Sequence, residues 1–197
     1  MYKLGITGGM GSGKSTAAEF FKQKGATIFD ADVEAKYYIQ KTESLQKLII
    51  HNFGSQIITD KHLDLNKLSD IAFASENSQK RLNDIVWPEV YSIIQNAANK
   101  AASKGIKLFL VDAALLLEAE LTEFFNSILL ITAEKSVRHN RILLRGNIPE
   151  NQIEQRMALQ MPESQKKKLA HTTIENNGDV AELYVKLEFF WEKLNII

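Results

Sequence analysis

The chain has no cysteine among its 197 residues, which excludes disulfides and cysteine-ligated zinc sites. Such a composition suits a reducing compartment, and we expect a cytoplasmic protein. An excess of charge of one sign is also missing, because 24 Lys and Arg residues balance 24 Asp and Glu residues. No overall field therefore draws the chain to nucleic acid or to a membrane surface, and we expect neither as a partner.

Long apolar runs are absent as well, and none approaches the roughly 20 residues that a membrane-spanning helix needs. The N-terminus leads directly into a predicted strand, so we expect no signal peptide. The length and a hydrophobic content of 45% fit one α/β domain with an insertion or two. No structural metal is predicted, since metal-ligand spacing is missing among the histidines, which are His51, His62, His139 and His171.

What the chain does have is a glycine-rich run, Gly8–Thr16, directly after an apolar segment. It fits the P-loop pattern G-x-x-x-x-G-K-[ST], whose defining residues here are Gly8, Gly13, Lys14 and Ser15. In such a loop, backbone N–H groups and the N-terminus of the following helix bind phosphates. Lys14 can reach the β- and γ-phosphates, and the Ser15 hydroxyl can ligate Mg²⁺. The sequence therefore predicts a nucleoside triphosphate with Mg²⁺ at this loop.

Short apolar runs alternate with helical patterns along the chain. Strands are predicted near residues 3–7, 26–29, 107–111, 128–131 and 172–174. Such alternation favours a parallel sheet with helices on both faces. We therefore expect an α/β fold of three layers, with a P-loop core built on five parallel strands.

Two stretches are longer than a simple crossover requires. The first runs from about Val33 to Gly105 and contains several helical patterns, so we expect a mostly helical insertion. Trp87-Pro88 lies within the last of these patterns and predicts a helix boundary or a kink. The second stretch, residues 134–170, is basic at both ends, and its run Lys166-Lys167-Lys168 is typical of a solvated helix face.

Three arginines stand out in this second stretch. Arg138, Arg141 and Arg145 fall at positions i, i+3 and i+7, so they share one helix face. A cationic face in a P-loop protein suits a phosphate clamp, although a solvated helix has the same pattern.

Acidic residues follow two of the predicted strands. Asp30 and Asp32 come directly after the second strand, at the edge of the sheet where ligands bind in open α/β folds. We expect Asp32 to accept a proton from an attacking hydroxyl, while Asp30 is a helix cap, a site residue or both. Asp112 ends the third strand and suits either Mg²⁺ held through water or an ordinary surface position. Spacing alone does not tell whether Glu118 is a site residue or a surface residue.

These motifs occur in an order that resembles the dephospho-coenzyme A kinases over nearly the whole length. The motifs are the P-loop, Asp30-Ala31-Asp32, Leu115-Leu116-Leu117-Glu118, the arginine segment and Ile174-Glu175-Asn176-Asn177-Gly178. Within the arginine segment, the residues that fit the family's lid are Arg141, Arg145, Arg156 and Gln160. This ordered set is far more specific than the P-loop alone.

The resemblance implies a fold like that of the nucleoside monophosphate kinases. A P-loop core takes residues 1–32, 105–134 and 171–197, a helical acceptor domain for coenzyme A takes residues 33–104, and a lid takes residues 135–170. The implied reaction transfers the γ-phosphate of ATP to the ribose 3′-hydroxyl of dephospho-coenzyme A, the final step of coenzyme A synthesis. The partner is thus a small molecule, and the oligomeric state is left open.

The resemblance also implies a set of site residues. The catalytic residues are Asp32, Lys14 and Arg141, with Asp32 as the base and the lid arginines bracing the phosphates. Ser15 is the predicted Mg²⁺ ligand. ATP is expected to contact Gly9, Gly11, Ser12, Gly13, Lys14, Ser15, Thr16, Arg141, Arg145 and Asn176.

The chain departs from the family's pattern mainly on the acceptor side, while the P-loop is intact. Trp87 stands where the family usually has a His, and Ala114 stands where it usually has a Pro. Further departures are Lys61, Leu65 and His171.

Other kinds of P-loop protein are alternatives. Shikimate kinases also pair a P-loop with Asp-x-Asp after the second strand, but their glycine cluster near the third strand is missing here. A nucleotide switch protein would carry Asn-Lys-x-Asp, whereas Asn66-Lys67-Leu68-Ser69 lacks the final Asp. An ATP-binding chain without catalysis is disfavoured by the presence of Lys14, Ser15 and Asp32.

Overall fold

The computed structural model describes residues 1–146, 149–194 and 196 of the chain. Its main sheet has five parallel strands in the order β2-β5-β1-β6-β7. Their bounds are β1 Tyr2–Thr7, β2 Thr27–Asp30, β5 Leu108–Asp112, β6 Ser127–Thr132 and β7 Thr172–Glu175. Each begins and ends within one residue of its predicted span, and the predicted five-stranded parallel α/β fold is confirmed.

Helices cover both faces of this sheet, which explains why β5 and β6 are buried along their whole length. The helices are α1 Lys14–Gln23, α2 Ala31–Lys41, α3 Glu43–Phe53, α4 Leu65–Ala72, α5 Glu76–Ser103, α6 Lys135–Arg145, α7 Glu150–Ala158, α8 Glu163–Leu169 and α9 Val180–Leu194. On one face, Leu108 and Leu110 of β5 join a core with α1 and α9. On the other face, Phe109 and Val111 join a core with α2 and α5. Successive β5 side chains thus enter two different cores.

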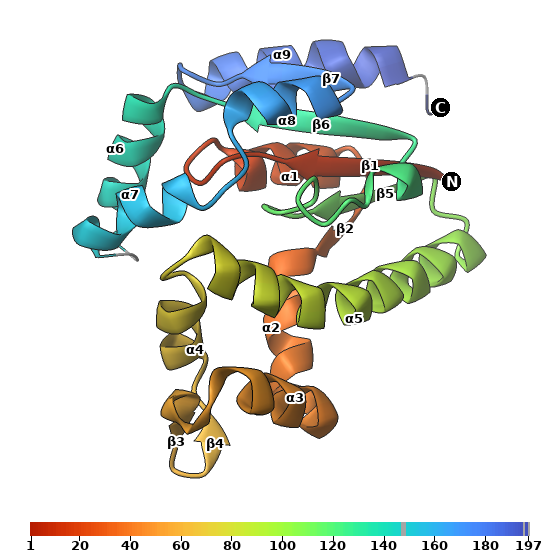
Figure 1. Ribbon diagram of the computed structural model, residues 1–197. Helices are drawn as coiled ribbons and strands as arrows, with labels where there is room; N and C mark the ends of the chain where they lie inside the picture. Colours follow the sequence, from red (N-terminus) through yellow and green to blue (C-terminus); the bar gives the residue numbers. More distant parts are fainter. Residues whose placement is uncertain (147–148, 195, 197) are drawn as a thin grey trace.

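The stretch between β2 and β5 carries α2 to α5 and a small antiparallel hairpin of β3 (Ile58–Thr59) and β4 (His62–Leu63). Figure 1 shows these elements as a group on one side of the sheet, with α2 leading into it from β2. Buried residues of this group, such as Ile49 and Ile94, belong to the same core as Phe109 of the sheet. The insertion is therefore packed onto the sheet through one continuous apolar cluster.

Helix α5 runs through Pro88 without interruption, so the helix boundary predicted as one alternative at this residue is wrong. Proline removes one backbone hydrogen bond, and its ring crowds the carbonyl four residues earlier, which bends a helix. Figure 1 shows α5 changing direction near the middle of its length, as the alternative prediction of a kink requires. Val86 and Val90 are buried on either side of Pro88, and their packing holds the helix together across the bend.

Helices α6, α7 and α8 occupy the stretch between β6 and β7. Figure 1 shows α6 and α7 as a pair at one side of the molecule. They enclose a small apolar cluster of Ile142, Ile153 and Met157 that is separate from the two cores of the sheet. Within the described ranges, no helix is long and apolar enough to cross a bilayer.

Candidate active site

The P-loop connects β1 to α1 at the carboxyl edge of the sheet. Gly11 and Gly13 have φ angles of 80° and 99°, in the left-handed region that favours glycine. A side chain on Gly13 would also collide with the Asn176 amide group. The N–H groups of Gly11 and Gly13 have no acceptor among the described residues. The loop therefore presents unpaired donors at a helix N-terminus, which fits the phosphates of a nucleotide.

Two side chains from distant segments hold this loop. The Asn176 side chain donates to the Ser12 carbonyl at 2.8 Å, and Gln160 accepts from the Met10 N–H at 2.8 Å. Asn176 is only 5% exposed, so it supports the loop from behind. Its predicted contact with the nucleotide stays a prediction.

Lys14 lies at the start of α1 between two carboxylates. Its Nζ is 3.4 Å from Asp32 Oδ2 and forms a closer ion pair with Asp112 Oδ1. Asp112 ends β5 opposite Asp30 of β2, so the neighbouring parallel strands finish at the same edge of the sheet. Because Asp112 is only 3% exposed, its interpretation as a surface residue is wrong.

Burial and neighbouring charges shift the pKa values of Lys14 and Asp112 in opposite directions. Burial alone would lower the pKa of Lys14, but the Asp32 and Asp112 carboxylates outweigh it and raise the pKa above its ordinary value. Burial raises the pKa of Asp112, and the neighbouring Lys14 ammonium offsets only part of that effect. At neutral pH Lys14 therefore keeps the positive charge that a phosphate site needs.

The two carboxylates after β2 have different surroundings. Asp30 is the N-cap of α2, where its Oδ1 accepts from the Val33 N–H at 3.0 Å. Asp32 lies in the first turn of α2, and its Oδ2 accepts from the Ala114 N–H at 3.3 Å as well as from Lys14. No hydrogen bond to Asp32 Oδ1 comes from the part of the chain that the structure describes. This oxygen is therefore available to a ligand.

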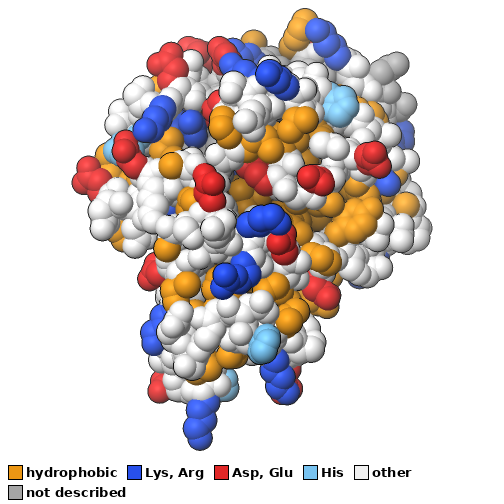
Figure 2. Space-filling view, viewed as in Figure 1, with side chains coloured by type: hydrophobic (Ala, Val, Ile, Leu, Met, Phe, Trp, Pro, Cys, Tyr) orange, Lys and Arg blue, Asp and Glu red, His pale blue; other side chains and the backbone are white. Residues whose placement is uncertain are grey.

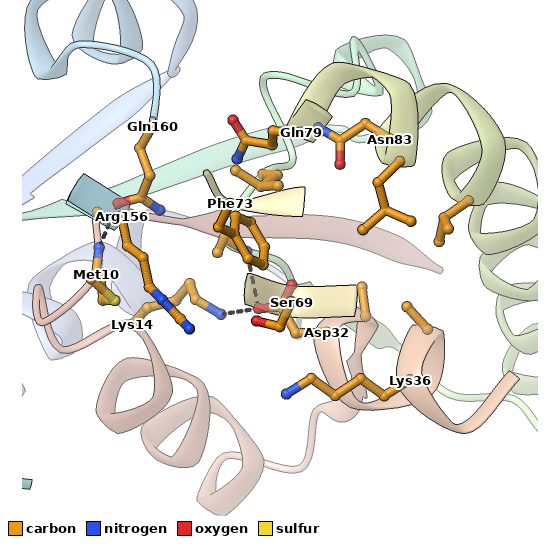
Figure 3. A pocket seen from close by; sticks show the side chains of 18 of the residues that line it. Met10, Lys14, Asp32, Lys36, Ser69, Phe73, Gln79, Asn83, Arg156 and Gln160 are labelled. Carbon is orange, nitrogen blue, oxygen red and sulfur yellow. Dashed lines mark hydrogen bonds and ion pairs between the residues drawn. The ribbon is translucent and has the colours of Figure 1, made fainter. Parts of the chain in front are cut away.

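Asp32 and Lys14 face a cavity of about 480 Å³ between the P-loop and the insertion (Figure 3). The opposite wall is apolar and comes from α2, the α4 segment and α5; it includes Ile39, Leu68, Phe73, Leu82, Val86, Trp87 and Val90. Figure 2 shows basic and hydrophobic side chains gathered where the surface is hollowed between the two halves of the molecule. One side of the cavity thus suits phosphates, and the other suits an apolar or aromatic group.

The three arginines of α6 have different surroundings, and they do not form one phosphate clamp in this structure. Arg138 is buried and donates from Nε to a backbone carbonyl at 3.0 Å. Arg141 donates to the carbonyls of Asn176 at 2.9 Å and Gly178 at 2.7 Å. Of the three, Arg145 alone lines the cavity. The first turns of α6 meet the loops of the core, and only its last turn reaches the cavity.

The predicted site residues are therefore divided between two places. The cavity is lined by Gly9, Gly11, Ser12, Gly13, Lys14, Ser15, Asp32 and Arg145. Thr16, Arg141 and Asn176 are not part of its lining. The catalytic role of Arg141 stays a prediction, and here its guanidinium braces the chain after β7.

Sequence reasoning missed a buried lysine. Lys166 of α8 is 0% exposed; its Nζ forms an ion pair with Glu118 Oε1 at 2.9 Å and donates to the Ala114 carbonyl at 3.3 Å. The prediction of a solvated face is wrong for Lys166, although Lys167 and Lys168 are exposed as expected. The signal available was the apolar run that ends in Glu118, because a carboxylate among buried leucines requires a cationic partner.

Oxygen ligands for a metal ion lie close to the P-loop. Ser15 and Asp32 line the cavity, and Asp112 forms an ion pair with Lys14 beside them. The described chain has no group of three or more His, Cys, Asp or Glu side chains that could hold a metal alone. Mg²⁺ in nucleotide sites is usually held by one or two protein oxygens together with substrate phosphates and water. The residues present therefore fit a Mg²⁺ that is bound together with a nucleotide.

Comparison with known proteins identifies the group to which this chain is similar. The family model described as dephospho-CoA kinase matches residues 2–182. The dephospho-CoA kinase of Fusobacterium nucleatum is 34% identical over 193 residues, which cover 97% of each chain. That of Salinibacter ruber is 33% identical with the same coverage. The structure of TT1252 from Thermus thermophilus superposes with a TM-score of 0.81 at 26% identity, covering 98% of each chain. With a family model that spans most of its length, the chain belongs to the dephospho-CoA kinase family.

Proposed function

We propose that this protein transfers the γ-phosphate of ATP to the 3′-hydroxyl of the ribose of dephospho-coenzyme A. The observation that carries the proposal is the position of Asp32. This carboxylate lies 3.4 Å from the P-loop lysine and lines the cavity that the insertion closes on its other side. A donor site and an acceptor pocket thus meet at one potential base, and family membership supplies the acceptor.

The donor half rests on the loop and on Lys14. The phosphates bind to the unpaired N–H groups of Gly11 and Gly13 and to the N-terminus of α1. Lys14 contacts the β- and γ-phosphates. Ser15 would hold Mg²⁺ directly, and Asp112 would hold it through water. When bound, Mg²⁺ neutralises the charge that develops on the phosphates.

Asp32 serves the acceptor half. Its Oδ2 is fixed by Lys14 and by the Ala114 N–H, which leaves Oδ1 to accept the proton of the attacking hydroxyl. As the O–H bond breaks, the hydroxyl oxygen forms its bond to the γ-phosphorus, and ADP leaves. Lys14 stabilises the charge on the transferring group.

We assign the remaining segments accordingly. Residues 33–104 bind the acceptor, and residues 135–170 form a lid that excludes water, which would otherwise compete as an acceptor. Arg145 and Arg156 of this lid, which line the cavity, brace the phosphates. The cytoplasm is the proposed location, which suits an ATP-dependent chain without disulfides.

Asp32→Asn tests the assignment of the base. We expect turnover of dephospho-coenzyme A to fall about 10²-fold or more while ATP binding stays near normal, because only the proton acceptor is removed. Asp30→Asn is the matched control, since Asn also caps a helix well and turnover should be kept. Near-normal turnover in the Asp32→Asn variant would overturn the role of Asp32. Turnover by the wild-type chain with only shikimate or only water as acceptor would overturn the proposed reaction.

A further inference from the structure

The tip of the P-loop, Gly9-Met10-Gly11, lies against the helices that follow β6. A side chain on Gly9 would collide with the Arg138 guanidinium and the Glu163 carboxylate. One on Gly11 would collide with the backbone carbonyl of Arg138. The two glycines therefore allow α6 and α8 to approach the loop closely. Of the three tip residues, only Met10 has a side chain that can hold these helices.

Met10 contacts the helices in two ways. Its side chain packs against the apolar cluster that α6 and α7 enclose, whose members are Ile142, Ile153 and Met157. Its N–H donates to Gln160 Oε1 at 2.8 Å, two residues after the end of α7. The cluster is separate from both cores of the sheet, and among the described residues Met10 alone joins it from another part of the chain. This side chain is therefore the apolar link between the P-loop and α7.

Helix α7 carries an arginine from this link into the cavity. Arg156 directly precedes Met157 of the cluster, and it lines the cavity together with Lys14. In Figure 3 the Arg156 side chain extends toward the end of Lys14. The position of α7 relative to the loop thus determines where this guanidinium lies over the proposed phosphate site.

The contacts of α7 with the insertion are weaker. Gln155 donates to the Ala74 carbonyl at 3.2 Å in an exposed position, and Arg156 lies 3.8 Å from Asp70, whose side chain is 62% exposed. An exposed ion pair contributes little free energy. The packing of Met10 therefore fixes α7 over the P-loop more firmly than the insertion does.

We propose that Met10 is a positioning residue that couples nucleotide binding at the P-loop to the placement of Arg156. This inference rests on the proposed function, in which Arg156 braces the phosphates. Met10 directly precedes Gly11, whose N–H has no acceptor among the described residues. A phosphate bound at Gly11 restricts the loop, and the Met10 side chain then restricts α7. By linkage, docking of α7 strengthens nucleotide binding by the same factor.

Three variants separate this role from ordinary packing. Met10→Ala withdraws the side chain from the cluster and keeps the N–H for Gln160. Met10→Leu is the conservative variant, since leucine has a similar volume and should keep the contact. Leu144→Ala is the matched control, because Leu144 lies on α6 but is 88% exposed.

Hydrogen exchange measured by mass spectrometry reports how firmly α7 is docked. Without ligand, we expect the amides of residues 150–158 to exchange about tenfold faster in Met10→Ala than in the wild type, while those of β5 are unchanged. ATP with Mg²⁺, at a concentration that saturates each variant, should slow this exchange in the wild type, in Met10→Leu and in Leu144→Ala. The slowing factor in Met10→Ala should be smaller by about fivefold or more. An equal slowing factor in Met10→Ala and the wild type would overturn the proposal.

A double-mutant cycle with Arg156→Met tests the same link through catalysis, and it stays informative if Met10→Ala loosens the fold elsewhere. Met10→Ala should lower kcat/KM for dephospho-coenzyme A about tenfold in the wild-type background, because Arg156 is displaced. In the Arg156→Met background the same change should lower kcat/KM less than about twofold, because no arginine remains to be misplaced. Equal factors in the two backgrounds would mean a general structural defect and would refute the coupling.

The outcomes distinguish this inference from the proposed function. If the wild-type chain phosphorylates dephospho-coenzyme A, but the slowing factors are equal and the kinetic factors are the same in both backgrounds, only this inference fails. If the wild-type chain does not phosphorylate dephospho-coenzyme A, the proposed function itself fails, and hydrogen exchange alone decides whether Met10 couples the loop to α7.

Discussion

Asp112 is the buried partner of the P-loop lysine, and its burial has a consequence for stability. Because the pKa of this carboxyl is raised, the folded chain keeps a proton that the unfolded chain has released between about pH 4 and the raised value. The folded state binds more protons than the unfolded state in this interval. The contribution of Asp112 to the unfolding free energy therefore falls as the pH rises through it.

The Asp112→Asn variant removes this contribution. We expect the wild-type chain to lose stability relative to Asp112→Asn as the pH is raised from about 4, because only the wild type must then ionise a buried carboxyl. Urea denaturation of both chains at several pH values measures the difference. A difference in unfolding free energy that is constant with pH would contradict the effect of burial.

Lys166 neutralises Glu118 in the interior, and its loss should be costly. Lys166→Met leaves the Glu118 carboxylate buried without its cation, so we expect the unfolding free energy to fall by about 3–5 kcal/mol. Lys167→Met is the matched control, since the Lys167 side chain is 45% exposed and its ion pair lies on the surface. The unfolding free energy of this control should stay within about 0.5 kcal/mol of that of the wild type.

The double variant Lys166→Met/Glu118→Leu separates charge from packing. Two apolar side chains can replace a buried ion pair, so the double variant should recover much of the stability lost in the single one. Denaturant titrations of the three variants give the comparison. A double variant as unstable as Lys166→Met alone would mean that the lost packing of the lysine, and not the unpaired charge, is responsible.

At the scale of elements, α6 carries two arginines with different surroundings. Arg141 ties α6 to the chain after β7 through two backbone carbonyls, whereas Arg145 lines the cavity. We expect Arg141→Met to lower the unfolding free energy by about 1.5–3 kcal/mol, the usual size for hydrogen bonds to charged groups. Arg145→Met should keep the unfolding free energy within about 0.5 kcal/mol of the wild-type value and should reduce turnover. Thermal denaturation and a kinase assay on the same samples provide the measurements. Full stability with lost turnover in Arg141→Met would contradict the structural role and support the predicted catalytic role of Arg141.

The elements themselves could largely be predicted because the strands of a doubly covered sheet are continuously apolar. β5 and β6 are buried along their whole length, and this pattern shows in the sequence. The course of α5 through Pro88 could not be predicted in the same way. It depends on the burial of Val86 and Val90 against other elements, which is a tertiary effect.

In the site, likewise, the residues placed by local sequence could be predicted, and those placed by tertiary packing could not. The P-loop and Asp32 were predictable, because local spacing and a strand end place them. The partners of Lys166 and Arg141 were not, because they lie 48 and more than 30 residues away along the chain and depend on how α8 and α6 pack.

At the scale of the whole molecule, nucleotide binding should stabilise the fold. ATP with Mg²⁺ at 100 times its Kd should add about 2.7 kcal/mol to the unfolding free energy, seen as a rise in Tm. The rise should shrink when EDTA removes Mg²⁺, and it should shrink in Lys14→Met when each chain is compared with its own ligand-free form. Thermal denaturation with and without ATP measures both effects. An undiminished rise in Lys14→Met would remove the donor site from the P-loop.

The two side chains that hold the P-loop bear on how a newly made chain becomes active. The loop is synthesised before both partners, because Gln160 and Asn176 lie 150 and 164 residues further along the chain. β1 likewise pairs with β5 and β6, which follow the whole insertion. A chain emerging from the ribosome therefore exposes its glycine-rich loop long before the partners that shape it exist. ATP capture is thus a late event in biosynthesis, because the loop becomes functional only after residues made long after it have folded onto it.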